Sequence, residues 1–211
     1  MTARSGKKLS VRKAPTQARS QQMVRGILEA TKRLLKRSTS DSSARLTTNH
    51  IAHEAGISVG SLYQYFPNVE AILLALHQSN MDRVQAVLDA WNTPAHLALP
   101  RWEFLERLNA AILHAEAESE VVFALHRAMK TDPALAAADR RHAEAVAQKL
   151  GAFLKHHGST WAPRKLQRLV LYVYYVNFGT WLYRDHVRPG KKESQDWEVA
   201  TIRSLYERCF E

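Results

Sequence analysis

The chain contains a single cysteine, Cys209, which excludes an internal disulfide and suits a reducing compartment. No stretch reaches the roughly 18 to 20 uncharged apolar residues that a membrane-spanning helix needs. Residues Met1 to Arg19 also lack the apolar core of a secretory signal. We therefore expect a soluble, cytoplasmic protein that has no membrane partner.

Strand signals and catalytic motifs are missing as well. No segment alternates apolar and polar residues between turns, and no internal repeat is visible. We find no glycine-rich phosphate loop, nucleophile elbow or cysteine cluster. His53 and Glu54 begin the zinc-protease pattern HExxH, but Ile57 stands where its second histidine must be. We expect a non-enzyme without catalytic residues, cofactor or metal site, although the scattered histidines leave a metal-sensing site as a minor alternative.

Acidic residues are scarce at the beginning of the chain. Residues 1–45 hold twelve Lys or Arg against Glu29 and Asp41, and this excess equals the net charge of +10 of the whole chain. Such a concentration is typical of a surface that faces phosphates. The alternative interpretation is a solvated basic tail.

The sequence does contain a helix-turn-helix pattern between Leu46 and Phe66, which reads LTTNHIAHEAGISVGSLYQYF. Thr47 or Thr48 can cap a first short helix, because threonine is favoured at that position. Gly56 supplies the left-handed residue that commonly ends a helix. The spacing therefore predicts a first helix followed by a tight turn.

A second short helix follows this turn. Ser58 can cap it, and Pro67 stops it. Leu62 and Phe66 stand four residues apart, so they share one buried side. The positions predicted to surround its outward surface are Val59, Gly60, Ser61, Tyr63, Gln64 and Tyr65.

The segment AGISVGSLYQYFPNVEAI resembles the TetR family of bacterial transcriptional regulators, and the resemblance extends over about Ser20 to Leu76. It implies that the second helix enters the major groove of DNA. It also implies that Thr47, Thr48 and Ser58 hold the DNA backbone, which fixes register without reading sequence. One departure is Val69, where the family usually places a phosphate-binding lysine; we expect the N-terminal arm to replace that contact.

The outward residues of the second helix have different capacities for contacting DNA. Gln64 can pair with adenine, Val59 can contact a thymine methyl group, and Gly60 permits close approach of the backbone. Tyr63 and Tyr65 are expected at phosphates, with packing of their rings in the core as the alternative. The predicted DNA-binding residues are Thr47, Thr48, Ser58, Val59, Gly60, Ser61, Tyr63, Gln64 and Tyr65.

Apolar residues recur at helical spacing along the remainder, so we predict an all-α fold. A basic, flexible arm over residues 1–19 precedes a three-helix DNA-binding head with its linking helix over 20–82. A larger helical body for ligand binding and dimerisation covers 83–211. The predicted helices cover about 16–37, 47–55, 58–66, 68–91, 133–157 and 194–210; two more are marked by apolar residues within 104–115 and 121–129, and another begins at Pro163 and contains 169–183.

The segment Leu169 to Tyr183 is apolar on nearly all sides, which indicates that two surfaces cover it. We expect these surfaces to be the core of the body and a second subunit, with the last helix as companion. The resemblance implies the same homodimer, in which two terminal helices of each subunit form a four-helix bundle. Burial wholly within one subunit is the alternative.

These features predict a sequence-specific regulator that binds a palindromic DNA operator. The resemblance implies a repressor released by a small-molecule effector. Aromatic residues of the body suit an apolar ligand pocket, but the sequence does not identify its lining residues. The alternatives are a DNA-binding protein without effector, acting as an activator or architectural protein, and an enzyme with a coincidental helix-turn-helix.

Overall fold

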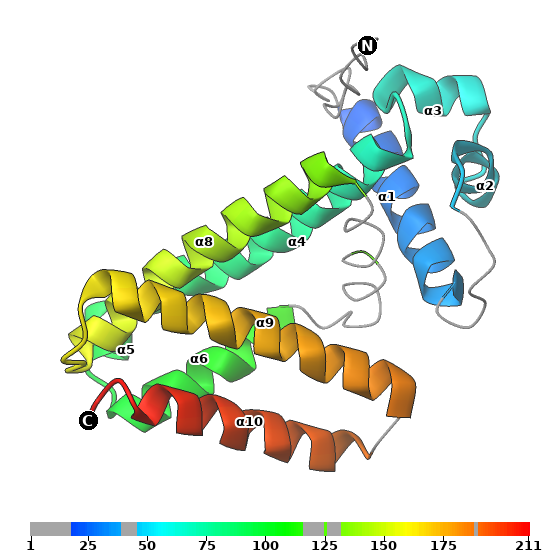
Figure 1. Cartoon of the computed structure of the whole chain (residues 1–211). Coiled ribbons are helices and arrows are strands. Elements are labelled where there is room, and N and C mark those ends of the chain that lie inside the picture. The colour runs from blue at the N-terminus through cyan, green and yellow to red at the C-terminus, as the bar shows by residue number, and fades with distance from the viewer. Residues whose placement is uncertain (1–17, 39–45, 116–124, 126–131, 188–189) are drawn as a thin grey trace, which may run out of the picture. The chain divides into compact units, whose positions relative to one another are not determined.

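The computed structural model describes residues 18–38, 46–115, 125, 132–187 and 190–211, and the regular structure in these ranges is entirely α-helical. The all-α prediction is therefore confirmed. None of the described helices combines the length and the apolar character needed to cross a membrane. The helices in Figure 1 are α1 (Ala18–Ser38), α2 (Thr48–Glu54), α3 (Val59–Tyr65), α4 (Val69–Trp91), α5 (Pro94–Leu97), α6 (Arg101–Ala115), α8 (Pro133–His156), α9 (Pro163–Val187) and α10 (Lys191–Glu207).

The chain divides into two compact units. The first contains Met1–Ser79 and Glu120–Ala136, and the second contains Asn80–Ser119 and Ala137–Glu211. Helices α4 and α8 therefore contribute residues to both. The predicted helix over 121–129, apart from Leu125, and most of the predicted basic arm lie outside the described residues.

Two apolar clusters form the core of the first unit. Helix α1 supplies residues to both, because its apolar positions recur at helical spacing while its Lys and Arg residues lie between them. The first cluster joins α1 to α2, α3 and the start of α4 through Ile27, Ile51, Ala52, Leu62, Phe66, Ala71 and Ile72. The second consists of Leu35, Leu73, Leu76, Leu125 and Leu135.

Side-chain caps fix the starts of two long helices where the sequence predicts them. The amide of Ala71 donates to Oδ1 of Asn68 at 2.8 Å, before α4. The amide of Ala134 donates to Oδ1 of Asp132 at 2.9 Å, and Pro133 is the first residue of α8. Both caps are confirmed, since each side chain satisfies an amide that has no partner within its own helix.

Two boundaries differ from the prediction. The segment 92–100, predicted as a loop, contains the single turn α5, whose cap Thr93 accepts a hydrogen bond from the amide of His96. The last helix begins at Lys191 rather than at Ser194. Ser194 is buried and its amide donates to the carbonyl of Gly190 at 3.1 Å, so this serine lies within the first turn.

The second unit is also built around two clusters. One joins α4, α6 and α8 through Val84, Leu88, Phe104, Leu108, Val146 and Phe153. The other joins α8, α9 and α10 through Ala147, Leu154, Leu166, Val170, Val173, Ile202, Tyr206 and Cys209, and α9 and α10 run side by side in Figure 1. The predicted pairing of the last two helices is confirmed.

The end of the chain is anchored to the turn between α8 and α9. Gly158 has a φ of +95°, which confirms the predicted stop of α8. The hydroxyl of Ser159 donates to the carbonyl of Cys209 at 2.6 Å. Cys209 is fully buried, and this burial raises the pKa of its thiol.

Candidate nucleic-acid interface

Helices α2 and α3 are joined by a tight turn with a left-handed residue at Gly56, whose φ is +67°. The amide of Gly56 donates to the carbonyl of His53 at 3.1 Å, and that of Ile57 donates to the carbonyl of Ala52 at 3.0 Å. This pair of bonds is the Schellman arrangement that closes a helix end. The predicted role of Gly56 is confirmed.

Ser58 begins the second helix of the motif as predicted. Its Oγ accepts a hydrogen bond from the amide of Ser61 at 3.0 Å and lies 2.8 Å from the hydroxyl oxygen of Ser61. Leu62 and Phe66 are fully buried in the core cluster of the first unit. Helix α3 is therefore held by one apolar side and by a capped start.

The threonines at the start of α2 have separate contacts. Thr47 is the cap, and its Oγ1 accepts a hydrogen bond from the amide of His50 at 3.2 Å. Oγ1 of Thr48 lies 3.1 Å from the hydroxyl of Tyr63 on α3. The two helices are thus joined by a hydroxyl pair as well as by their apolar sides.

The candidate residues of α3 differ in exposure. Gly60, Tyr63 and Gln64 are exposed, and Tyr63 shows 40% of its surface. The outward placement of Val59 and Tyr65 needs correction, because both are half-buried and pack against the core cluster that also contacts Ile57. This cluster draws on α1, α2 and α4, so it extends beyond the narrow apolar side of a seven-residue helix.

Glu54 is the one acidic residue between Leu46 and Phe66, and two arginines of α1 neutralise it. Nε of Arg33 lies 2.6 Å and Nη2 of Arg37 2.8 Å from the same carboxylate oxygen. Hydrogen bonds from Arg33 and then Arg37 lower the pKa of Glu54. The motif therefore presents no unpaired carboxylate that would repel the phosphates of a nucleic acid.

The sequence analysis missed this three-residue contact. Arg33 and Arg37 are four residues apart on α1, and so share one side of the helix, but Glu54 lies 17 or more residues further along the chain. Arg33 also donates to the backbone carbonyl of Glu54 at 3.1 Å, which is one of the carbonyls left open at the end of α2. In the sequence, the four-residue spacing of Arg33 and Arg37 was the only feature that pointed to this contact.

Val69, the position at which the family resemblance leads one to expect lysine, is the first residue of α4. Its side chain is half-buried and packs against both clusters of the first unit. Val69 therefore contributes to packing at the start of α4. Within the described part of the chain, no three His, Cys, Asp or Glu residues are grouped so as to hold a metal ion.

Comparison with known families matches residues 27–76 to the N-terminal domain described as "Bacterial regulatory proteins, tetR family". The matched segment begins in α1 and ends in α4, so it contains the whole α2–turn–α3 motif. A comparison with curated proteins finds no match.

Solved structures similar to this chain include a Rhodococcus sp. protein described as a TetR-family transcriptional regulator, at 15% identity and a TM-score of 0.66, covering 90% of this chain and 100% of that one. The multidrug binding protein EbrR, complexed with imidazole, is 21% identical with a TM-score of 0.58 and coverages of 86% and 93%. A TetR-like regulator from Rhodococcus sp. RHA1 has 15% identity, a TM-score of 0.60 and coverages of 93% and 97%. Residues 27–76 therefore match the DNA-binding domain of the TetR family, and the described part of the chain shares the fold of these solved structures.

Proposed function

We propose that this regulator binds a palindromic operator as a homodimer and that a small-molecule effector releases it, which makes it a repressor. The observation that carries the proposal is the division of α3 into a fully buried side, Leu62 and Phe66, and an exposed side with Tyr63 and Gln64. A helix supported in this way can enter the major groove without unfolding its own core. In this proposal residues 20–82 bind DNA, and residues 83–211 bind the effector and form the dimer.

The proposed contacts divide into positioning and reading. Thr47, Thr48, Ser58 and Tyr63 offer hydroxyl groups for phosphates. Bases are read by the exposed Gln64 with further contacts from Val59, Gly60 and Ser61, while Tyr65 contacts a phosphate. The half-buried Val59 and Tyr65 present only part of their side chains to such contacts.

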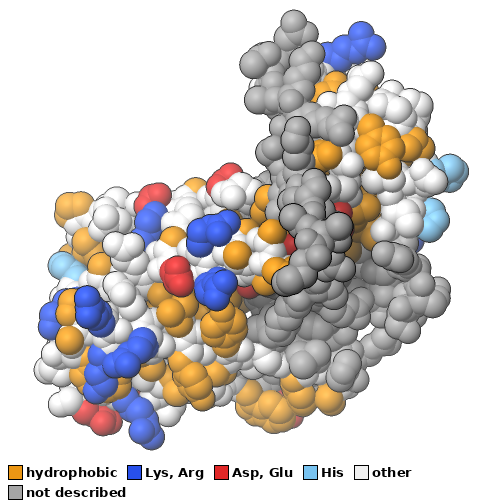
Figure 2. Space-filling model, turned by 45° about the horizontal axis from the view of Figure 1, so that its top comes forward, with side chains coloured by type: hydrophobic (Ala, Val, Ile, Leu, Met, Phe, Trp, Pro, Cys, Tyr) orange, Lys and Arg blue, Asp and Glu red, His pale blue; other side chains and the backbone are white. Residues whose placement is uncertain are grey.

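The surface of the second unit supports a dimer. On α9 the residues Tyr172, Tyr175, Gly179 and Tyr183 recur at intervals of three or four and are all exposed, Tyr172 by 58% and Tyr175 by 51%. Trp197 of α10 is 53% exposed, and its ring centroid lies 6.3 Å from that of Tyr183. Figure 2 shows hydrophobic side chains exposed along the lower part of this unit. Such a surface is typical of protein–protein contact, and the proposed partner is a second copy of the chain.

Buried polar groups without hydrogen-bond partners in the second unit support the proposal that this unit binds a small-molecule effector. Nε2 of Gln85 on α4 and Oδ1 of Asn177 on α9 are buried and make no hydrogen bond with any described residue. Buried amide groups normally have partners, so these two are suitable handles for a ligand with its own donors and acceptors. The similarly folded EbrR is a multidrug binding protein, which agrees with an effector of modest polarity. The proposal includes no catalytic step and places the protein in the cytoplasm with its DNA.

Selection of bound fragments from random duplex DNA by the purified full-length chain tests the proposal. We expect enrichment of a palindrome whose half-sites are about one or two helical turns apart, because two α3 helices related by a two-fold axis must reach the same face of the duplex. Absence of an enriched motif would contradict sequence-specific binding. A single, non-palindromic half-site would contradict dimeric reading.

A compound screen separates effector-controlled binding from the second candidate, DNA binding without an effector. The screen follows release of a fluorescent operator from the full-length chain. A released operator, with the compound bound to protein alone, supports the repressor proposal. Compounds that bind the second unit but never change operator affinity would favour a protein that organises or activates without an effector.

A further inference from the structure

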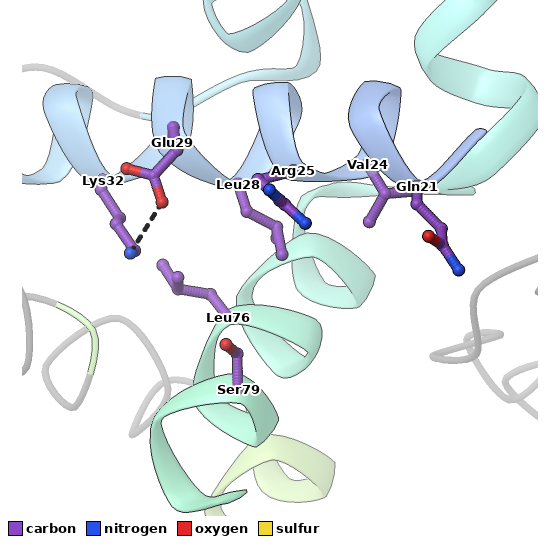
Figure 3. A pocket seen from close by; sticks show the side chains of 8 residues that line it. All are labelled: Gln21, Val24, Arg25, Leu28, Glu29, Lys32, Leu76 and Ser79. Atoms are coloured by element: carbon purple, nitrogen blue, oxygen red, sulfur yellow. Dashed lines mark hydrogen bonds and ion pairs between the residues drawn. The ribbon is translucent and has the colours of Figure 1, made fainter. Parts of the chain in front are cut away.

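The first unit contains an open cavity of about 320 Å³, whose lining residues all belong to α1 and α4. It lies between α1 and α4, and Figure 3 shows side chains of α1 on one side of it and Leu76 and Ser79 of α4 on the other. Val24 and Leu28 of α1 and the fully buried Leu76 of α4 form its apolar part. Its volume is at the lower end of the range for small-molecule sites.

The polar rim of this cavity carries a positive excess. Nζ of Lys32 lies 2.9 Å from Oε1 of Glu29, so these two charges compensate each other. Arg25 also lines the cavity, is exposed, and has no hydrogen bond or ion pair with any residue that the structure describes. The helix that bears these residues contains six basic side chains against Glu29 alone. Among the described residues, Arg25 therefore offers an unpaired guanidinium at the rim, on a helix with an excess of positive charge.

An apolar wall beside an available guanidinium selects a particular ligand chemistry. A carboxylate or sulfonate can accept two parallel hydrogen bonds from an arginine. An attached hydrocarbon body would cover the half-buried Val24 and Leu28 and remove their apolar surface from water. Inorganic phosphate or the DNA backbone would satisfy Arg25 but leave the apolar wall uncovered.

We propose that this cavity binds a small amphiphilic anion, such as a medium-chain carboxylate, with its head group at Arg25 and its hydrocarbon body against Val24 and Leu28. All lining residues belong to the first unit, so this site is distinct from an effector site in the second unit. Its occupant would contact α1 and α4, the two helices that share a core cluster with α2 and α3. The inference does not depend on the proposed operator, dimer or effector.

Methyl-resolved NMR of the full-length chain tests this site directly. Titration with decanoate should shift the methyl signals of Val24, Leu28 and Leu76 in a saturable manner. Decyltrimethylammonium, which has the same hydrocarbon body but the opposite charge, should bind at least about tenfold more weakly, because it cannot accept hydrogen bonds from Arg25. Equal binding of the two amphiphiles, or no shift of these methyls at millimolar decanoate, would overturn the proposal.

Two variants locate the head group and the cavity. Arg25→Gln should weaken decanoate binding about tenfold, whereas Lys36→Gln, the same change of charge on α1 outside the lining, should not weaken it. Ser79→Phe should fill the space and abolish the methyl shifts; Ser79 is an exposed lining residue, so the larger ring need not enter the core. Wild-type affinity in either Arg25→Gln or Ser79→Phe, with circular dichroism showing both folded, would refute the assignment.

Discussion

The hydroxyl of Tyr63 lies 3.1 Å from Oγ1 of Thr48, so the outward side of α3 is tied to the start of α2. Tyr63 remains 40% exposed although its hydroxyl has this partner. This contact already fixes the orientation of the Tyr63 side chain, so less conformational entropy is lost when its hydroxyl binds a phosphate. Thr48 and Tyr63 would then act on DNA as one unit.

Replacing Tyr63 by Phe tests this unit. We expect Tyr63→Phe to weaken binding to operator and random DNA alike, by about 0.5 to 1.5 kcal/mol, because a phosphate contact carries no sequence information. Thr48→Val should have a similar effect, and the double variant should lose less than the sum of the two. Fluorescence anisotropy on both DNAs measures these affinities; additive losses would show that the two hydroxyls act independently.

Replacement of the two glycines of the motif by alanine should have different effects: one on stability, the other on DNA binding. Gly56→Ala should lower the free energy of unfolding by about 1 to 2 kcal/mol, since φ is +67° and a side chain is strained there. At Gly60 a Cβ would meet only Oγ of Ser58, at 3.8 Å, so Gly60→Ala should keep full stability while weakening operator binding through its added bulk. Urea unfolding followed by circular dichroism, with operator titration, separates the two effects. A stability loss at Gly60 would contradict its proposed role at the DNA.

Gln64→Ala should cost about 1 to 3 kcal/mol of operator binding and relax base preference at one position in each half-site. Gln64 is exposed and has no hydrogen bond with any described residue, so its removal should not change stability. Binding to a panel of operator variants measures the preference. Equal losses on operator and random DNA would show that Gln64 reads no base.

The contact of Glu54 with Arg33 and Arg37 predicts a dependence of stability on pH. Because the folded state lowers the pKa of Glu54, its stabilising contribution is complete above the ordinary glutamate pKa of about 4.3 and is lost as pH falls through the lower folded value. Wild type should therefore exceed Glu54→Gln in stability at pH 7, and the difference should shrink below about pH 4. A difference that persists unchanged at acid pH would attribute the effect to packing.

A carboxylate placed on the exposed stripe of α9 should disrupt the proposed dimer. Tyr175→Glu should shift sedimentation equilibrium toward monomer, because the interface would have to bury an unpaired charge. Tyr175 is 51% exposed, so the subunit itself should stay folded. Gln148→Glu, which adds the same charge at an exposed position of α8, serves as the control. Wild-type protein that sediments as a monomer at micromolar concentration would contradict the dimer directly.

The helix-turn-helix was predictable because its determinants are local. Gly56 and Ser58 act on amides and carbonyls within five residues of themselves, and Leu62 and Phe66 are neighbours on one helix. The four-residue helix α5 was missed because it is too short to display helical periodicity, although its Thr93 cap follows the ordinary rule.

Features that depend on distant neighbours were not predictable. Val59 and Tyr65 are half-buried because α1, α2 and α4 supply the cluster that they touch, and a seven-residue sequence gives no information on that depth. Arg33 and Glu54 meet only because α1 and α2 pack together. The cavity at Arg25 likewise requires α4 to approach α1, so no local motif could indicate it.

The last residues of the chain behave as core rather than as a tail. Cys209 is fully buried, its carbonyl accepts the Ser159 hydroxyl, and Arg101 lies 3.8 Å above the ring of Phe210. Truncation by three residues would therefore open a hole beneath α9 and α10 instead of trimming a loose end.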